Sequence, residues 1–202
     1  MSIKKISKAQ PELFEFTKEN LEKAKIEIKK YPKEKKASAL LPLLDLAQRQ
    51  HDNWIPTAAM KVVSEIINVP LIKVLEVATF YTMFNLEPVG KYFIQLCRTT
   101  PCWLRGSESL KETAEDITGC KLGETSSDGL FTLIEVECLG ACCNAPMVQI
   151  NNDYYEDLDK EQALKIIDQI LNGENPKPGS YRGRLNSEPE NNRKTLMDIK
   201  NA

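Results

Sequence analysis

The hydrophobic pattern of the first part of the chain predicts a helical bundle. Apolar residues recur three or four positions apart through residues 10–84, the spacing that places them on one face of a helix. The expected helices are residues 12–30, 38–50, 57–68 and 70–84. Pro42 and Pro70 fit because proline is tolerated in a first turn, where amide hydrogens have no helical partner. Short connections favour a compact bundle.

From residue 85 onward the pattern alternates between strands and helices. The expected elements are strands at 91–97 and 130–138, a helix at 109–119 between them, a hairpin around 151–153 and a helix at 159–173. Both long strands are expected to end on a cysteine. The order β-α-β-β-β-α, a strand–helix–strand crossover followed by a hairpin and a helix, is typical of a thioredoxin-like domain.

Cap signals predict the ends of the two later helices. Ser109 and Glu112 match a capping box at the start of the first, and Gly119 matches its end. Asp159 and Gln162 match the same kind of cap at the start of the second.

After Gly173 the chain is rich in asparagine, proline, glycine and charge, without a core of its own. We expect a tail that orders on a partner's surface, with simple disorder as the alternative. The predicted organisation is α+β: an N-terminal helical bundle (residues 1–87), a thioredoxin-like domain (88–175) and an extended polar tail (176–202).

Composition and charge exclude several classes of protein. The 202 residues carry a formal charge of −2, so no basic field argues for a nucleic-acid partner. No apolar run reaches about 18 residues, so we expect no direct membrane insertion. The N-terminus lacks the apolar stretch of a secretory signal. We therefore expect a reducing compartment, where clustered cysteines bind metal or do redox chemistry more often than they form disulfides.

Four of the six cysteines fall in two clusters, Cys97 with Cys102 and Cys138 with Cys142. Parallel strands joined by a crossover finish at the same edge of a sheet, so the loops that follow them are expected to lie side by side. The four thiolates should then converge. His51 is the one histidine, which excludes a Rieske centre and a Cys2His2 zinc site.

The spacing of the cysteines discriminates between metals. Structural zinc sites favour Cys-x2-Cys, whereas spacings of four and three intervening residues suit a larger group with two metal centres, such as [2Fe–2S]. A zinc site stays open as an alternative. A thiol–disulfide enzyme would need Cys-x-x-Cys at the start of the first helix, and that motif is absent. Amides of residues 98–106 and 139–143 are expected to donate to the sulfurs.

The remaining cysteines and the histidine have ordinary structural interpretations. We expect the side chain of Cys143 to point away from the site and Cys120 to be a small buried residue. We expect His51 to cap or pack rather than to bind a metal.

Several stretches of the sequence resemble one known family. The segments "QLCRTTPCWLRGS", "LGETSSDGLFTLIEVECLGACCNAPMVQIN" and "YYEDL" are similar to the small iron–sulfur subunit (24 kDa, NuoE-type) of respiratory NADH:quinone oxidoreductase, complex I. The segments "NWIPTAAMKVVSEI", "VATFYTMF" and "GSYRGRLNSEP" resemble the same family. The resemblance covers roughly residues 13–190.

The resemblance implies a thioredoxin-like [2Fe–2S] ferredoxin domain with one cluster on Cys97, Cys102, Cys138 and Cys142. It implies electron exchange with the FMN of an NADH-binding flavoprotein subunit, beside the large iron–sulfur subunit of complex I. This chain has no G-x-G-x-x-G after a strand, so we expect no NADH-binding or catalytic site of its own. The implied location is peripheral, on the cytoplasmic side of a bacterial inner membrane or the matrix side of the mitochondrial one.

Other functions stay open at this point. Related subunits serve NAD-linked hydrogenases and formate dehydrogenases as diaphorase components. A free-standing ferredoxin and a zinc-stabilised interaction module are further alternatives. Arg98, next to the first ligand, stands where many relatives are expected to have a small residue, and we expect it to raise the cluster's potential.

Overall fold

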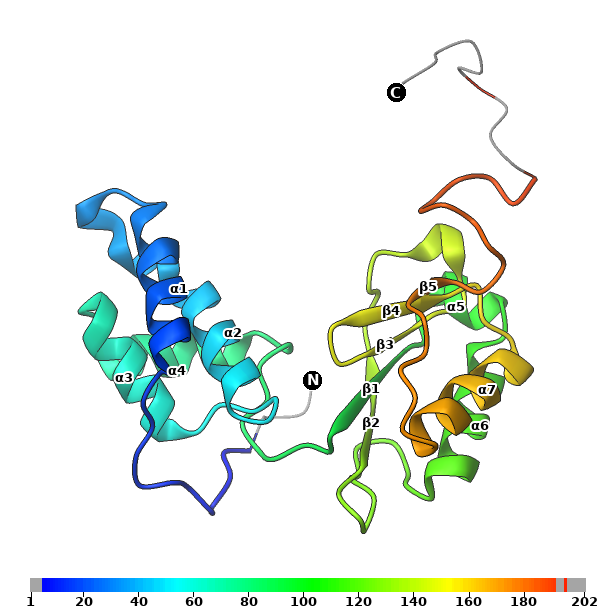
Figure 1. Cartoon of the computed structure of the whole chain (residues 1–202), viewed down its shortest axis with the longest axis horizontal. Helices are drawn as coiled ribbons and strands as arrows, with labels where there is room; N and C mark the ends of the chain where they lie inside the picture. The colour runs from blue at the N-terminus through cyan, green and yellow to red at the C-terminus, as the bar shows by residue number, and fades with distance from the viewer. Residues whose placement is uncertain (1–4, 192–194, 196–202) are drawn as a thin grey trace. The chain divides into compact units, whose positions relative to one another are not determined.

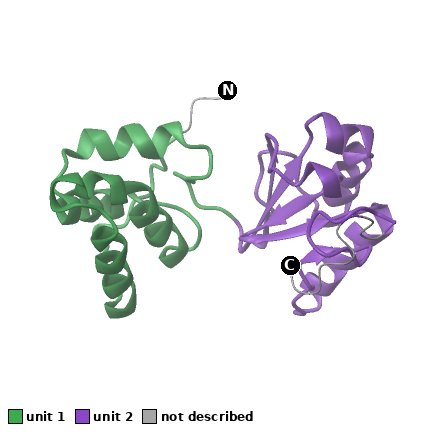
Figure 2. Ribbon diagram, turned by 90° about the horizontal axis from the view of Figure 1, so that it is seen from above, with its two compact units in different colours: residues 1–89 green, residues 90–202 purple. Residues whose placement is uncertain are grey.

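The computed structural model describes residues 5–191 and Thr195 (Figure 1). The chain divides into two compact units, residues 1–89 and residues 90–202 (Figure 2). The sequence placed a boundary at residue 87 and separated the tail from residue 176 onward. That the parts are independent domains, and that the tail docks on a partner, stay predictions.

The first unit is helical. Its elements are α1 (Lys18–Lys29), the 3-10 helix η1 (Lys33–Ala39), α2 (Leu40–Gln50), α3 (Thr57–Ile67) and α4 (Leu71–Phe80). The prediction of helix throughout residues 10–84 was too broad, because residues 10–17 are not helical and α4 ends four residues early. Tyr81, at the C-terminus of α4, has an extended backbone. Pro42 lies in the first turn of α2, as predicted.

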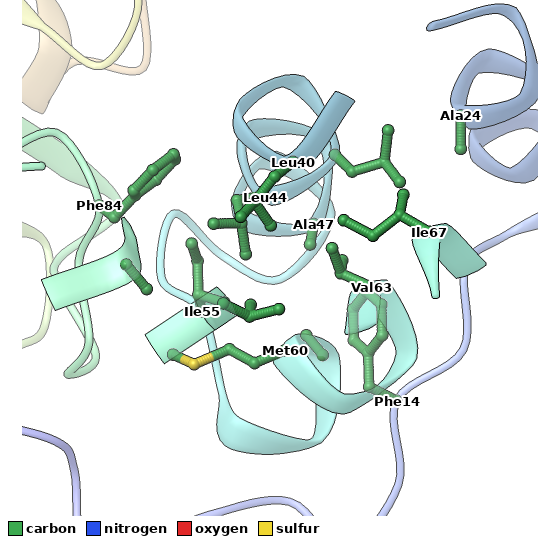
Figure 3. Close-up of a cluster of buried hydrophobic side chains, with 14 of the residues drawn as sticks. Phe14, Ala24, Leu40, Leu44, Ala47, Ile55, Met60, Val63, Ile67 and Phe84 are labelled. Carbon is green, nitrogen blue, oxygen red and sulfur yellow. The ribbon is translucent and has the colours of Figure 1, made fainter. Parts of the chain in front are cut away.

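The helices of the first unit are held together by one hydrophobic core. Leu44 of α2 packs together with Ile55, which precedes α3, and with Met60 and Val63 of α3 (Figure 3). All four side chains are fully buried. His51 is the C-cap residue of α2, and its ring packs 4.7 Å from the ring of Trp54. This confirms its predicted packing role.

The second unit is a mixed sheet with helices. Its elements are β1 (Tyr92–Cys97), α5 (Thr100–Leu104), α6 (Ser107–Thr118), β2 (Phe131–Val136), η2 (Cys142–Asn144), β3 (Val148–Ile150), β4 (Asp153–Glu156), α7 (Lys160–Leu171) and β5 (Gly179–Ser180). The strand order is β2-β1-β3-β4-β5. β1 and β2 are parallel, β1–β3 and β3–β4 are antiparallel, and β4 and β5 are parallel. The predicted crossover followed by a hairpin is therefore present.

The helices α6 and α7 pack against each other beside the sheet (Figure 1). Leu133 on β2, Leu110 on α6 and Ile166 on α7 belong to the same buried cluster. Cys120 lies in this core at 3% exposure, as predicted for a small buried residue. The core therefore fixes the sheet from which the cysteine loops leave.

The ends of these elements correct some of the sequence predictions. α6 begins at Ser107 rather than at residue 109, and its N-cap is Gly106, so the predicted capping box of Ser109 and Glu112 is wrong. Gly106 has φ +96°, a left-handed conformation that glycine adopts without strain, and it lets α6 follow α5 at once. The capping box of Asp159 and Gln162 on α7 is confirmed.

Candidate metal centre

The four predicted ligands lie in two loops that leave the sheet at one edge. Cys97 is the last residue of β1, and Cys102 lies in α5. Cys138 follows β2 by two residues, and Cys142 opens η2. Cys97 is in register with Val136 on the parallel strand β2. Because both strands run in the same direction, their carboxyl ends deliver the loops side by side, as the sequence predicted.

The four thiols are arranged as two pairs. The Sγ atoms of Cys138 and Cys142 are 3.2 Å apart. Cys97 and Cys102 interact through their thiols and are buried in a small cluster with Met147. Among the residues that the structure describes, no three cysteine, histidine, aspartate or glutamate side chains form a group suited to one metal ion.

The two pairs differ in their access to solvent. Cys97 and Cys102 are 2% and 1% exposed, whereas Cys138 and Cys142 are exposed. The site is thus closed by the protein on one side and open at the surface on the other. A group bound here would be shielded from water through the first pair and accessible through the second.

Hydrogen-bond donors converge on the sulfurs. The amide of Gly140 donates to Cys138 Sγ over 3.4 Å, and the Thr99 hydroxyl lies 3.4 Å from Cys97 Sγ. Backbone bonds from Thr99 and Leu139 also reach Cys97, and one from Met147 reaches Cys102. Such bonds stabilise negative charge on sulfur. Met147 lies outside the amide ranges expected from the sequence, because the return of the chain to β3 has no local signal.

The thiol pKa values reflect this environment. Burial would raise the pKa of Cys97, but bonds from Thr99 and Leu139 outweigh burial and lower it. Burial and then the neighbouring Cys97 raise the pKa of Cys102 to about 12. The bond between Cys138 and Cys142 lowers the pKa of the first and raises that of the second. In each pair one thiol therefore loses its proton more readily than the other, because two adjacent thiolates repel.

Arg98 ties the first loop to its surroundings. Its guanidinium donates over 2.6 Å to Glu135 on β2 and over 2.6 Å to Glu108 in the first turn of α6. Lys111 also donates to Glu108, over 2.8 Å. The positive charge of Arg98 is thus balanced by carboxylates, and we expect a smaller effect on the potential of a bound group than an unpaired arginine would have.

The residues present fit an iron–sulfur group. A [2Fe–2S] cluster takes four cysteine sulfurs, two on each iron, and the thiols here already lie two by two. The amides at the sulfurs are the donors that such clusters use to offset their negative charge. Cys143 is exposed as well, so exposure alone does not separate it from the predicted ligands Cys138 and Cys142. Its predicted orientation away from the site stays a prediction.

A family model for the thioredoxin-like [2Fe-2S] ferredoxin matches residues 24–171, which include both cysteine loops. The chain belongs to this family. The expected fold class and the expectation of one [2Fe–2S] cluster are thereby confirmed.

Curated relatives extend the match over most of the chain. The E-type subunit of the NADH-quinone oxidoreductase of Rickettsia conorii is 58% identical over 159 residues, which is 79% of this chain and 95% of the relative. The "NADH dehydrogenase [ubiquinone] flavoprotein 2, mitochondrial" of Dictyostelium discoideum is 48% identical over 185 residues, 92% of this chain and 75% of the relative. The resemblance seen in the sequence is confirmed.

Solved structures agree on the fold. A crystal structure of an NAD+-reducing [NiFe]-hydrogenase in the air-oxidized state matches with a TM-score of 0.56 at 21% identity. The match covers 64% of this chain and 23% of that one. None of the helices in the described part of this chain has the length and apolar character needed to span a bilayer.

Proposed function

We propose that this chain is the electron-transfer subunit of an NADH:quinone oxidoreductase. The observation that carries this proposal is the 58% identity to the Rickettsia conorii relative, over 95% of that relative's length. The geometry supports it, because the chain presents four thiols as two pairs at the edge of a thioredoxin-like sheet. The chain acts as one part of an oxidoreductase made of several subunits.

We propose Cys97, Cys102, Cys138 and Cys142 as the cluster ligands. The buried pair Cys97 and Cys102 would hold one iron, and the exposed pair Cys138 and Cys142 the other. The 3.2 Å contact between the thiols of Cys138 and Cys142 and the burial of Cys97 and Cys102 in one cluster support this division. When bound, such a cluster accepts and releases one electron at a time.

The residues of the chain set the conditions for that exchange. Four thiolates make the site strongly negative, and the amides of Thr99, Leu139, Gly140 and Met147 offset part of that charge. The hydroxyl of Tyr154 donates to the Leu139 carbonyl over 2.8 Å and so holds the second loop in place. These residues stabilise the charge of the site, and they do not make or break a bond in a substrate.

The proposed partners follow from the electron-transfer role of this chain, which leaves NADH oxidation to another subunit. The FMN and the NADH site would belong to a flavoprotein subunit, with the large iron–sulfur subunit of complex I beside it. The open side of the site, at Cys138 and Cys142, is where a redox partner can approach. Trp103 and Leu104, which follow Cys102 in the sequence, are 60% and 70% exposed and give the same unit exposed apolar surface. The assembled chain would lie peripherally on the cytoplasmic side of a bacterial inner membrane, or on the matrix side in mitochondria.

A second assembly fits the same fold. The fold shared with an NAD+-reducing hydrogenase keeps open, as an alternative, a diaphorase subunit of a hydrogenase or of a formate dehydrogenase. The relatives with more than half of their residues identical carry the quinone oxidoreductase name instead. The family match argues against the zinc-stabilised interaction module that the sequence left open.

Anaerobic purification of the full chain tests the proposal. We expect about two irons and two acid-labile sulfides per chain, and an electron paramagnetic resonance signal that appears on reduction. One zinc and no sulfide would contradict electron transfer. Purification of the tagged chain from its host should bring with it an FMN-containing subunit, and the enzyme activity of that complex separates quinone reductase from hydrogenase and formate dehydrogenase.

A further inference from the structure

After α7 the chain returns to the sheet, and a residue of the segment that follows forms a buried ion pair with the second unit. β5 lies beside β4, and the segment that follows continues along the same unit (Figure 1). Arg184 in this segment binds both oxygens of Asp157, with Nε to Oδ2 at 2.9 Å and Nη2 to Oδ1 at 2.5 Å. The two side chains are 10% and 3% exposed. A buried bidentate pair of this kind is strong and fixes the geometry of both partners.

The ion pair is completed by further hydrogen bonds. The Ser180 hydroxyl donates to Asp157 over 2.6 Å, and Arg184 Nη1 donates to the Glu188 carbonyl over 2.9 Å. Burial would raise the pKa of Asp157, but Arg184 and Ser180 outweigh burial and lower it. Asp157 is therefore ionised at neutral pH and holds the guanidinium in one orientation.

The same guanidinium reaches the second cysteine loop. Arg184 Nη2 also donates to the carbonyl of Cys143 over 2.7 Å. The next residue, Asn144, donates its side-chain amide to the Asn186 carbonyl over 2.7 Å. The backbone carbonyl of Asn144 accepts a hydrogen bond from the backbone amide of Asp157 over 2.8 Å. The turn Cys142–Asn144 is thus bound by the C-terminal segment and by the end of β4.

We propose that Arg184 is a positioning residue of the cluster site. It connects Asp157 to the backbone of η2 and so holds Cys142, the residue that opens this turn, where it can share an iron with Cys138. The C-terminal segment completes the site from a part of the chain 42 residues after Cys142. The inference rests on the proposed ligand set.

Arg182 provides a matched control. It lies two residues before Arg184 and is ion-paired with Glu190, and its side chain is 38% exposed. No hydrogen bond connects its side chain to the cysteine loop within the described residues. Arg182→Met and Arg184→Met therefore remove the same charge from the same segment, and the contact with η2 is lost in the second variant alone.

The experiment measures the loss of cluster absorbance from the full, loaded chain in the presence of an iron chelator. We expect Arg184→Met to lose the cluster about tenfold faster than the unaltered chain, a typical cost of removing a group that orients a metal ligand. We expect Arg182→Met to match the unaltered chain. Arg184→Lys keeps a charge beside Asp157 but presents a single ammonium that cannot span carboxylate and carbonyl, so its cluster should also be lost faster.

Hydrogen exchange in the metal-free chain provides an independent measurement. The amides of Asn144 and Ala145 bond to Ala141 and Cys142 within the turn. We expect their exchange to accelerate in Arg184→Lys and Arg184→Met, with amides of β1 and β2 unchanged. Equal cluster loss in the Arg182 and Arg184 variants, or equal acceleration over the whole unit, would overturn the inference.

Two further outcomes are decided by the same set of variants. If Arg184→Met does not fold, the test is made with Arg184→Lys. The inference is overturned if Arg184→Lys loses its cluster no faster than Arg182→Met does. Absence of a cluster from the unaltered chain would instead contradict the proposed function. The exchange measurement then still decides whether Arg184 positions the turn.

Discussion

The Arg98 guanidinium lies 2.6 Å from the Glu135 carboxylate, so the residue after Cys97 is bonded to the strand that leads to Cys138. Arg98 has a second bond to Glu108 at 2.6 Å. The sequence suggested an arginine that raises the cluster's potential by its charge. The structure shows an arginine whose charge is paired and which connects the end of β1 to β2 and α6.

Single substitutions in this pair should shift the reduction potential in opposite directions. Glu135→Gln removes a negative charge and should raise the midpoint potential, while Arg98→Met leaves Glu135 without its cationic partner and should lower it. Each shift should be on the order of 30 mV, because the groups are partly exposed and screened. A redox titration followed by paramagnetic resonance measures both. Shifts of the same sign would contradict this electrostatic account.

Serine substitutions test the ligand set. Cys102→Ser and Cys138→Ser should lose the cluster, because each removes one of four thiolates. Cys143→Ser and Cys120→Ser should keep it, and together they serve as controls of the same chemistry. Iron and sulfide analysis of each purified variant is the measurement. A chain that lost its cluster only with Cys143→Ser would require Cys143 in place of Cys142.

Alkylation should distinguish the two thiol pairs in the metal-free chain. Cys138 and Cys142 are exposed and should react quickly, together with Cys143. Cys97 and Cys102 are buried and should react slowly. In the loaded chain we expect Cys143 to remain the one rapidly labelled cysteine. Mass spectrometry of digested samples over a time course measures the labelling at each site, and rapid labelling of Cys102 in folded protein would contradict the buried pair.

The Asp157–Arg184 pair should make stability depend on pH in the acid range. Because the folded-state pKa of Asp157 is lowered, the stabilisation is fully present above its usual value of about 3.9 and is lost as the pH falls through the lowered value. Asp157→Asn should cost about 3 kcal/mol at neutral pH, since it leaves a buried arginine unpaired. Denaturant unfolding at several pH values should show this difference constant from about pH 5 to 8 and shrinking below about pH 4. A difference that grew in acid would be inconsistent with the ion pair.

A core substitution in the first unit tests whether the units are separate domains. Leu44 is fully buried, and Leu44→Ala should lower the stability of the first unit by about 3 kcal/mol. We expect the paramagnetic resonance signal of the second unit to stay unchanged. Leu133→Ala, at an equally buried position in the second unit, is the matched variant that should weaken cluster retention. Equal effects of both variants on the cluster would indicate one cooperative unit.

The sequence by itself determined the parts of this protein that depend on local pattern. The period of apolar residues predicted most of the helices and strands, because burial of one face imposes that period. The cysteines at two strand ends predicted a shared site, because a crossover brings parallel strand ends together. The capping box of Asp159 and Gln162 was correct, since both of its bonds lie within one turn.

Only the tertiary structure decided which distant groups meet at the site. The cap at Ser109 failed because α5, a short helix without a clear pattern, determines where α6 begins. Nothing near Arg184 in the sequence indicates that it binds Asp157 and the Cys143 carbonyl, and nothing near Met147 indicates a bond to Cys102. These contacts join residues that are 27 to 45 positions apart, and they form only when the sheet, η2 and the C-terminal segment have packed together.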